Sequence, residues 1–224
     1  MRKKSGTICI ILGLLLIAAA LGLTGYNLWD NERAGRASAD ITERMLEVMP
    51  ERAEYAPEDL LIQYVPEPTE TPSEDSHIGA EIEIGEEAIP AMETVTIEDY
   101  AYIGIVEIPA LKVTLPVMDT WDYTRLQIAP CRYAGSVYSN DMVICAHNFE
   151  KHFGPLLGAE PGMDVYFSTV DGNVYHYVVS NVEDVDPHAI DYMKNPGGTH
   201  DWDLTLFTCF FGGRSRCTLR CVRV

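Results

Sequence analysis

The stretch Asp203–Cys209 (DLTLFTC) alternates apolar and hydroxyl side chains in the way that predicts a β-strand with one buried face. It ends on a cysteine, which a strand end would hold rigidly while leaving its thiol free to face a cleft. Residues 210–213 then read as a hairpin connection, and residues 216–224 alternate again. A second strand should therefore return beside the first and bring Arg216 close to Cys209.

Cys209 is the candidate nucleophile, because a thiolate held near a base or a cation is an effective attacking group. Arg216 is the candidate for stabilising an oxyanion, since a guanidinium keeps its charge and offers several donors. Arg214 is the alternative for this role. We expect the remaining arginines of the tail, Arg220 and Arg223, to be solvated or paired with acids.

His147 is the candidate acid and base. It follows the apolar run Met142–Ala146, which predicts a buried strand, and it precedes a short helical turn near Phe153. His200 is the runner-up because it is close to Cys209 in sequence. The other histidines lie in less suitable places, namely His77, His152, His176 and His188.

Three motifs in chain order resemble the sortases, the cysteine transpeptidases of the Gram-positive cell surface. Residues 104–117 (GIVEIPALKVTLPV) resemble the sortase opening, His147-Asn148 with Phe153 and Leu156 resembles the histidine segment, and residues 204–209 with Arg216 resemble the cysteine segment. The resemblance covers about residues 100–224. It implies the roles given above for His147, Cys209 and Arg216.

The predicted fold is mainly β. Turn signals separate about eight short alternating segments, which favours a closed or nearly closed β-barrel with a few short helices. The resemblance implies the closed eight-stranded barrel of the sortase type. Strands are expected at residues 102–109, 112–117, 142–147, 163–168, 173–185, 203–209 and 216–224, and short helices near residues 123–128 and 153–157.

The chain divides into three predicted parts. Residues 1–29 hold a basic tail (Arg2-Lys3-Lys4) and an uncharged apolar run from Ile8 to about Tyr26, long enough to span a bilayer. We favour an uncleaved anchor over a cleaved signal peptide, with the following residues outside the cell. Residues 30–93 form an acidic, Pro-rich spacer that is expected to be disordered, with a short amphipathic helix near its start on which Ile41, Met45, Leu46 and Met49 share a side. Residues 94–224 form the catalytic domain.

The net charge of −18 argues against a nucleic-acid partner, because phosphate binding needs a basic face. Residues 40–93 carry most of the imbalance, with 16 Asp and Glu against 2 Lys and Arg. None of the six cysteines forms a C-x-x-C pair, and we expect Cys145, Cys217 and Cys221 to be structural. We expect no cofactor. Calcium bound by Glu183, Asp184, Asp186 and Asp191 is the alternative.

By resemblance, the chain would be a membrane-anchored sortase. Cys209 would cleave a C-terminal sorting signal of secreted proteins through a thioester, and an amine of a cell-wall precursor or a pilin lysine would resolve it. A cysteine peptidase that lets water resolve the same thioester is one alternative, and a surface β-barrel that only binds is another. The sorting motif, the acceptor and the sortase class stay open.

Overall fold

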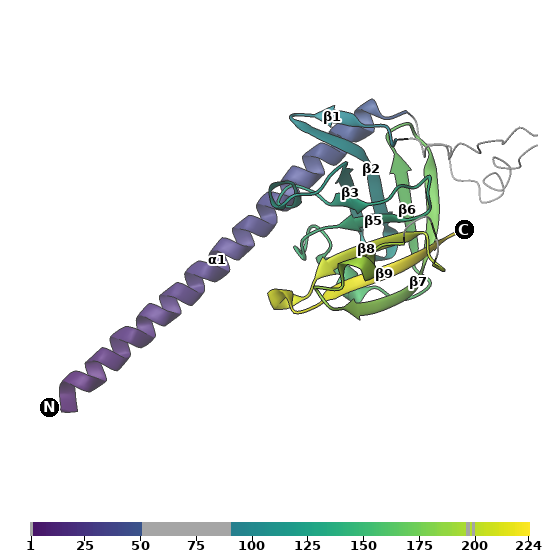
Figure 1. The fold of residues 1–224 in the computed structure, drawn as a ribbon. Coiled ribbons are helices and arrows are strands. Elements are labelled where there is room, and N and C mark those ends of the chain that lie inside the picture. Colours follow the sequence, from purple (N-terminus) through teal and green to yellow (C-terminus); the bar gives the residue numbers. More distant parts are fainter. Residues whose placement is uncertain (1, 51–90, 196–197, 199) are drawn as a thin grey trace, which may run out of the picture.

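The computed structural model describes residues 2–50, 91–195, 198 and 200–224. Within them, nine strands form one sheet in the order β1-β2-β3-β4-β5-β8-β9-β7-β6, and β2 also pairs with β6. Strands β2 to β9 therefore close into an eight-stranded barrel, to which β1 adds at the edge of β2 (Figure 1). The predicted closed eight-stranded barrel is confirmed.

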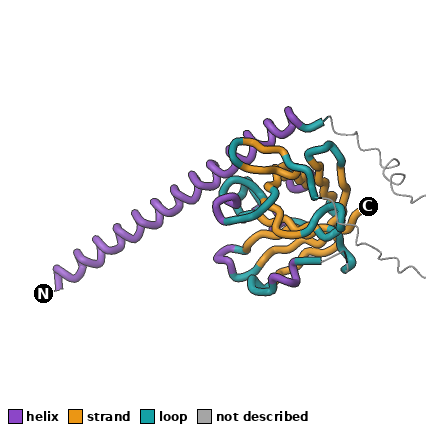
Figure 2. Tube along the Cα trace, turned by 45° about the horizontal axis from the view of Figure 1, so that its top comes forward, coloured by secondary structure: helices purple, strands orange, loops and turns teal. Residues whose placement is uncertain are grey.

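The strands are β1 Val95–Ile97, β2 Tyr100–Ile108, β3 Val113–Met118, β4 Cys131–Ala134, β5 Met142–Cys145, β6 Asp164–Thr169, β7 Val174–Val185, β8 Leu204–Cys209 and β9 Arg216–Arg223. Short helices lie between them: η1 Pro109–Leu111, α2 Tyr123–Leu126, η2 Gly154–Gly158, η3 Ile190–Met193 and η5 Phe211–Gly213 (Figure 2). The pairs β3–β4 and β5–β8 are parallel, and the other pairs are antiparallel.

The barrel closes at Gly104, where β2 pairs with both β3 and β6. A Cβ atom at this position would lie 2.2 Å from the carbonyl oxygen of Ser168 and 2.8 Å from the ring of Phe167. Only glycine allows the two backbones to approach so closely. This close approach explains why the opening motif begins with a glycine.

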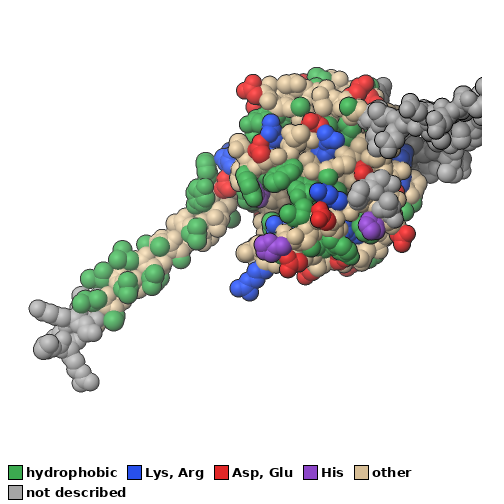
Figure 3. All heavy atoms as spheres, viewed as in Figure 1, with side chains coloured by type: hydrophobic (Ala, Val, Ile, Leu, Met, Phe, Trp, Pro, Cys, Tyr) green, Lys and Arg blue, Asp and Glu red, His purple; other side chains and the backbone are tan. Residues whose placement is uncertain are grey.

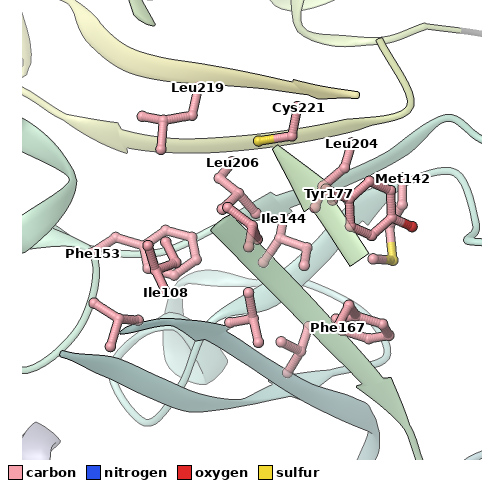
Figure 4. Close-up of a cluster of buried hydrophobic side chains, with 14 of the residues drawn as sticks. Ile108, Met142, Ile144, Phe153, Phe167, Tyr177, Leu204, Leu206, Leu219 and Cys221 are labelled. Carbon is pink, nitrogen blue, oxygen red and sulfur yellow. The ribbon is translucent and has the colours of Figure 1, made fainter. Parts of the chain in front are cut away.

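The barrel interior is filled by one cluster of apolar side chains from all sides of the ring (Figure 4). Ile144 and Leu206 come from the parallel pair β5 and β8, and Leu219 and Cys221 come from β9. Because these residues are fully buried, they fix the register of the strands that carry the candidate site.

The predicted strands are present with small shifts, and two strands were missed. β1 and β4 contain three and four residues, too few to show a period-2 pattern. Strand β5 ends at Cys145, so His147 follows the strand by two residues and does not lie within it.

Helix α1, Arg2–Val48, runs without a break from the predicted anchor into the segment where a separate amphipathic helix was expected. Its N-terminal part is long and apolar enough to cross a membrane, and its apolar side chains are exposed (Figure 3). Figure 1 shows this part projecting away from the barrel.

The C-terminal part of α1 packs on the outside of the barrel. Ile41, Met45 and Met49 belong to a second cluster of buried residues with Tyr102 and Ile105 of β2. Leu46, which was expected on the same side, is 48% exposed. This packed segment belongs to the region that the sequence assigned to the spacer, of which residues 51–90 lie outside the described residues.

The packing of α1 predicts a stability difference between two neighbouring residues. Met45→Ala removes a fully buried side chain and should lower the free energy of unfolding by about 2–5 kcal/mol. Leu46→Ala on the exposed side should change it by no more than about 0.5 kcal/mol. Denaturant unfolding of the full chain in detergent measures both. Equal effects would show that α1 does not dock on the barrel as described.

Candidate active site

Cys209 and Arg216 face each other because of the register between β8 and β9. They are direct partners across this antiparallel pair, so their side chains project to the same side of the sheet. The Nη1 atom of Arg216 donates a hydrogen bond to the Sγ atom of Cys209 at 3.0 Å. The predicted return of the second strand therefore places a guanidinium beside the thiol.

The connection between these strands depends on two glycines. Gly212 and Gly213 have φ angles of 79° and 69°, in the left-handed region that favours glycine. The amide of Phe210 donates to the carbonyl oxygen of Ser215 at 3.0 Å, which closes the loop directly after Cys209. The loop thus returns the chain to the sheet at Ser215, one residue before β9 begins at Arg216.

His147 reaches the same edge of the sheet because β5 and β8 are parallel and end side by side. Two hydrogen bonds tie the ends together. The amide of Ala146 donates to the carbonyl oxygen of Phe207 at 3.3 Å, and the hydroxyl of Thr208 donates to the carbonyl oxygen of Ala146 at 2.9 Å. These contacts lie one residue before His147 and one or two residues before Cys209.

The three predicted site residues line one cleft of about 490 Å³. Its walls include an aromatic group in which Trp121 lies 5.3 Å from Tyr133, and Tyr133 lies 5.5 Å from Phe207, between ring centroids. Exposed residues at the rim include Tyr123 and Ile190. A cleft of this size with an apolar wall is suited to part of an extended peptide.

The ring of His147 is partly buried, and this burial lowers its pKa, with Asp30 of α1 opposing the shift. Its Nε2 atom lies 3.1 Å from the amide nitrogen of Gln127, and its ring lies 5.0 Å from that of Phe149. Because its pKa is lowered, His147 is biased toward the neutral form that can accept a proton.

The other histidines lie in different settings. His200 stacks on Trp202, and His176 pairs with Asp164, both away from the cleft lining. His188 does line the cleft, which its loop position in the sequence did not indicate. His77 lies outside the described residues.

His152 is buried, and its Nε2 atom lies 3.0 Å from the hydroxyl of Ser38 on α1. Burial lowers its pKa to about 4. The folded state therefore binds fewer protons than the unfolded state between about pH 6.5 and pH 4, so stability should fall as pH decreases through this window.

The lowered pKa of His152 predicts a measurable loss of stability at acidic pH. Between pH 6.5 and 4, His152 should account for a decrease of about 3 kcal/mol in the free energy of unfolding. His152→Gln should flatten that part of the pH dependence, whereas His188→Gln, at an exposed position, should not. Denaturant titrations at a series of pH values test this, and an unchanged slope in His152→Gln would refute it.

The remaining arginines of the tail lie apart from the thiol. Arg214 is exposed after η5 and does not line the cleft. Arg220 is 2% exposed, bonds to Glu183 at 2.7 Å and lies over the ring of Trp202. Arg220 is therefore paired with an acidic residue, as expected, although its side chain is buried within the protein. Arg223 is exposed over the ring of Tyr175.

The position of Arg216 predicts different effects for two conservative changes. Arg216→Lys keeps the charge but loses the planar fork, and should lower activity at least about tenfold. Arg214→Lys should have little effect, since Arg214 is exposed and does not line the cleft. Rates of sorting-signal cleavage by both variants provide the measurement. Reversed severities would assign the role to Arg214.

The other cysteines of the barrel are buried, as the sequence predicted for Cys145, Cys217 and Cys221. Burial raises the pKa of Cys131 to about 12 and that of Cys217 to about 11, and it also raises the pKa values of Cys145 and Cys221. Such thiols stay protonated and unreactive at neutral pH. Cys209, by contrast, is only partly buried at the cleft.

In the described part of the chain, no group of three or more His, Cys, Asp or Glu residues is arranged to hold a metal ion. In the acidic segment considered for calcium, Glu183 instead pairs with Arg220.

Comparison with known proteins identifies the family. The model of the sortase domain matches residues 106–224, so the chain belongs to the sortase family of cysteine transpeptidases. No match was found among curated proteins.

Solved structures of sortases are similar to this chain. A lid mutant of sortase A from Corynebacterium diphtheriae is 22% identical, with a TM-score of 0.50 over 57% of this chain and 72% of that one. Sortase C from Streptococcus pneumoniae is 25% identical, with a TM-score of 0.49 over 55% of this chain and 68% of that one. The first likeness supports the fold.

Proposed function

We propose that this protein is a membrane-anchored sortase in which Cys209, His147 and Arg216 carry out transpeptidation on a C-terminal sorting signal. The observation that carries the proposal is the 3.0 Å contact between the guanidinium of Arg216 and the sulfur of Cys209, in a cleft that His147 also lines. The thiols of the buried Cys131, Cys145 and Cys217 instead donate to backbone carbonyl oxygens.

In the first step, neutral His147 accepts the proton of the Cys209 thiol, and the resulting thiolate attacks a backbone carbonyl carbon of the sorting signal. The C–N electron pair of the scissile bond leaves with the amine, and the imidazolium form of His147 gives that amine a proton. Arg216 donates hydrogen bonds to the carbonyl oxygen as negative charge develops on it. The product is a thioester on Cys209.

In the second step, an amine attacks the thioester carbon. His147, now neutral, accepts the proton that the amine loses, and the sulfur of Cys209 leaves as a thiolate. The new amide joins the two partners. The acceptor is an amine of a cell-wall precursor or a lysine of a pilin, and the geometry of the cleft is compatible with either.

The N-terminal half of α1 supports the membrane anchor. It is long and apolar enough to span a bilayer, and its large apolar side chains from Ile8 onward are exposed. The basic residues Arg2, Lys3 and Lys4 would keep the N-terminus in the cytoplasm, so the barrel would lie outside the cell.

A peptidase that uses the same thioester but lets water resolve it is the second candidate. The two reactions share Cys209 and differ only in the attacking group, so only the products separate them. A barrel that merely binds would need no cation beside its thiol, and the Cys209–Arg216 contact disfavours it.

Intact-protein mass spectrometry with a panel of sorting-signal peptides tests the nucleophile. The native chain should form a covalent acyl adduct, and Cys209→Ala should lose the adduct completely while keeping its thermal unfolding midpoint. Cys217→Ala is the matched control, because it removes a buried thiol from the neighbouring strand and should keep the adduct. An adduct on Cys209→Ala would show that the chemistry lies elsewhere.

A further inference from the structure

We propose that Gln127 is a positioning residue for His147, and that Arg33 of helix α1 fixes the orientation of the Gln127 amide. The segment of α1 next to the predicted membrane span would thereby be a working part of the active site. The predicted effect on kcat/KM rests on the proposed function, whereas the predicted effect on the titration of His147 does not.

Gln127 is held in place from several directions. It caps the C-terminus of α2, where its backbone amide donates to the carbonyl oxygens of Thr124 and Arg125. The next residue, Ile128, accepts a hydrogen bond from the hydroxyl of Ser38 on α1 at 2.6 Å. Helix α1 thus fixes the backbone directly beside Gln127.

The side chain of Gln127 lies between α1 and the candidate catalytic ring. Its Oε1 atom is 3.5 Å from Nη2 of Arg33, and its Nε2 atom is 3.1 Å from Nε2 of His147. Arg33 is itself held by Asp30, with the two charged groups 2.8 Å apart. A continuous row of polar contacts therefore runs from Asp30 through Arg33 and Gln127 to His147.

The donor and acceptor pattern of this row decides which way the amide faces. A guanidinium has donors only, so it attracts the amide oxygen of Gln127 and leaves the amide nitrogen directed at His147. The amide nitrogen can only donate, so Nε2 of His147 must accept. The ring is then held in the neutral form that carries its proton on Nδ1.

This orientation adds to the effect of the surroundings on His147. Burial already disfavours its charged form, while the carboxylate of Asp30 favours it. His152 lies close on the neighbouring segment, and Arg216 and His188 line the same cleft. Gln127 differs from these groups because the sign of its effect on the pKa of His147 depends on which end of its amide faces the ring. The amide nitrogen favours the neutral ring, and the amide oxygen would favour the charged ring.

The test uses the full-length chain in detergent, with the titration of His147 followed by NMR of its ring protons. Gln127→Glu places an acceptor with negative charge against Nε2 and should raise the pKa of His147. Arg33→Met frees the amide to turn its oxygen toward the ring and should also raise it. Arg44→Met is the matched control, since Arg44 lies on the same helix but pairs with Glu98, and it should leave the titration unchanged.

A double-mutant cycle separates action through Gln127 from the direct field of Arg33. In the Gln127→Leu background, Arg33→Met should produce no further shift in the titration of His147. Equal shifts in both backgrounds would show that Arg33 acts by its charge alone, and an unchanged titration in Gln127→Glu would show that Gln127 does not contact the ring. Either result would overturn the proposal.

Kinetics provide a second measurement. Gln127→Leu should lower kcat/KM about fivefold, the size expected for loss of one neutral hydrogen bond, with the acidic limb of its pH profile displaced. Unchanged kcat/KM and an unchanged limb would contradict the positioning role. If no peptide is processed by the native chain, the proposed function fails, while the NMR titration still decides whether Gln127 and Arg33 control His147.

Discussion

The pairing of β8 with β9 is the constraint on which the candidate site depends. Cys209 and Arg216 are opposite each other only in the observed register, and a slip by one residue would turn the guanidinium to the other side of the sheet. Leu206 faces Leu219 in the same pair, and both side chains are buried in the barrel interior. The hydrophobic core therefore fixes the register, and the register places the charge beside the thiol.

Parallel pairing of β5 with β8 performs the corresponding task for His147. Thr208 is fully buried, and its hydroxyl binds the carbonyl oxygen of Ala146. Thr208, which precedes Cys209, is thus hydrogen-bonded to Ala146, which precedes His147. Helix α1 adds a third support, because its buried residues pack on the outer face of the barrel and Arg33 contacts Gln127. The site is accordingly assembled from parts that are distant in sequence.

Local pattern was sufficient to predict a mainly β barrel, whereas the choice of Cys209, His147 and Arg216 also rested on the resemblance to the sortases. Alternation identified β8 and β9, and a buried apolar run identified β5. The short strands β1 and β4 could not be predicted, since three or four residues carry too little periodicity. The cleft walls Trp121 and Tyr133, and the partner Gln127, were missed for another reason. Their positions depend on tertiary packing between segments, and nothing in their local sequence indicates it.

The central claim is that the acyl group bound to Cys209 as a thioester is transferred to an amine. The most direct measurement incubates the full-length chain with a sorting-signal peptide, with and without an added amine such as oligoglycine or a diaminopimelate-type acceptor, and identifies the products by liquid chromatography and mass spectrometry. The account predicts a joined peptide–amine product whose yield increases with the amine concentration, while the yield of the hydrolysed free acid falls. Cleavage that yields only the free acid at every amine concentration would contradict it and would indicate a peptidase.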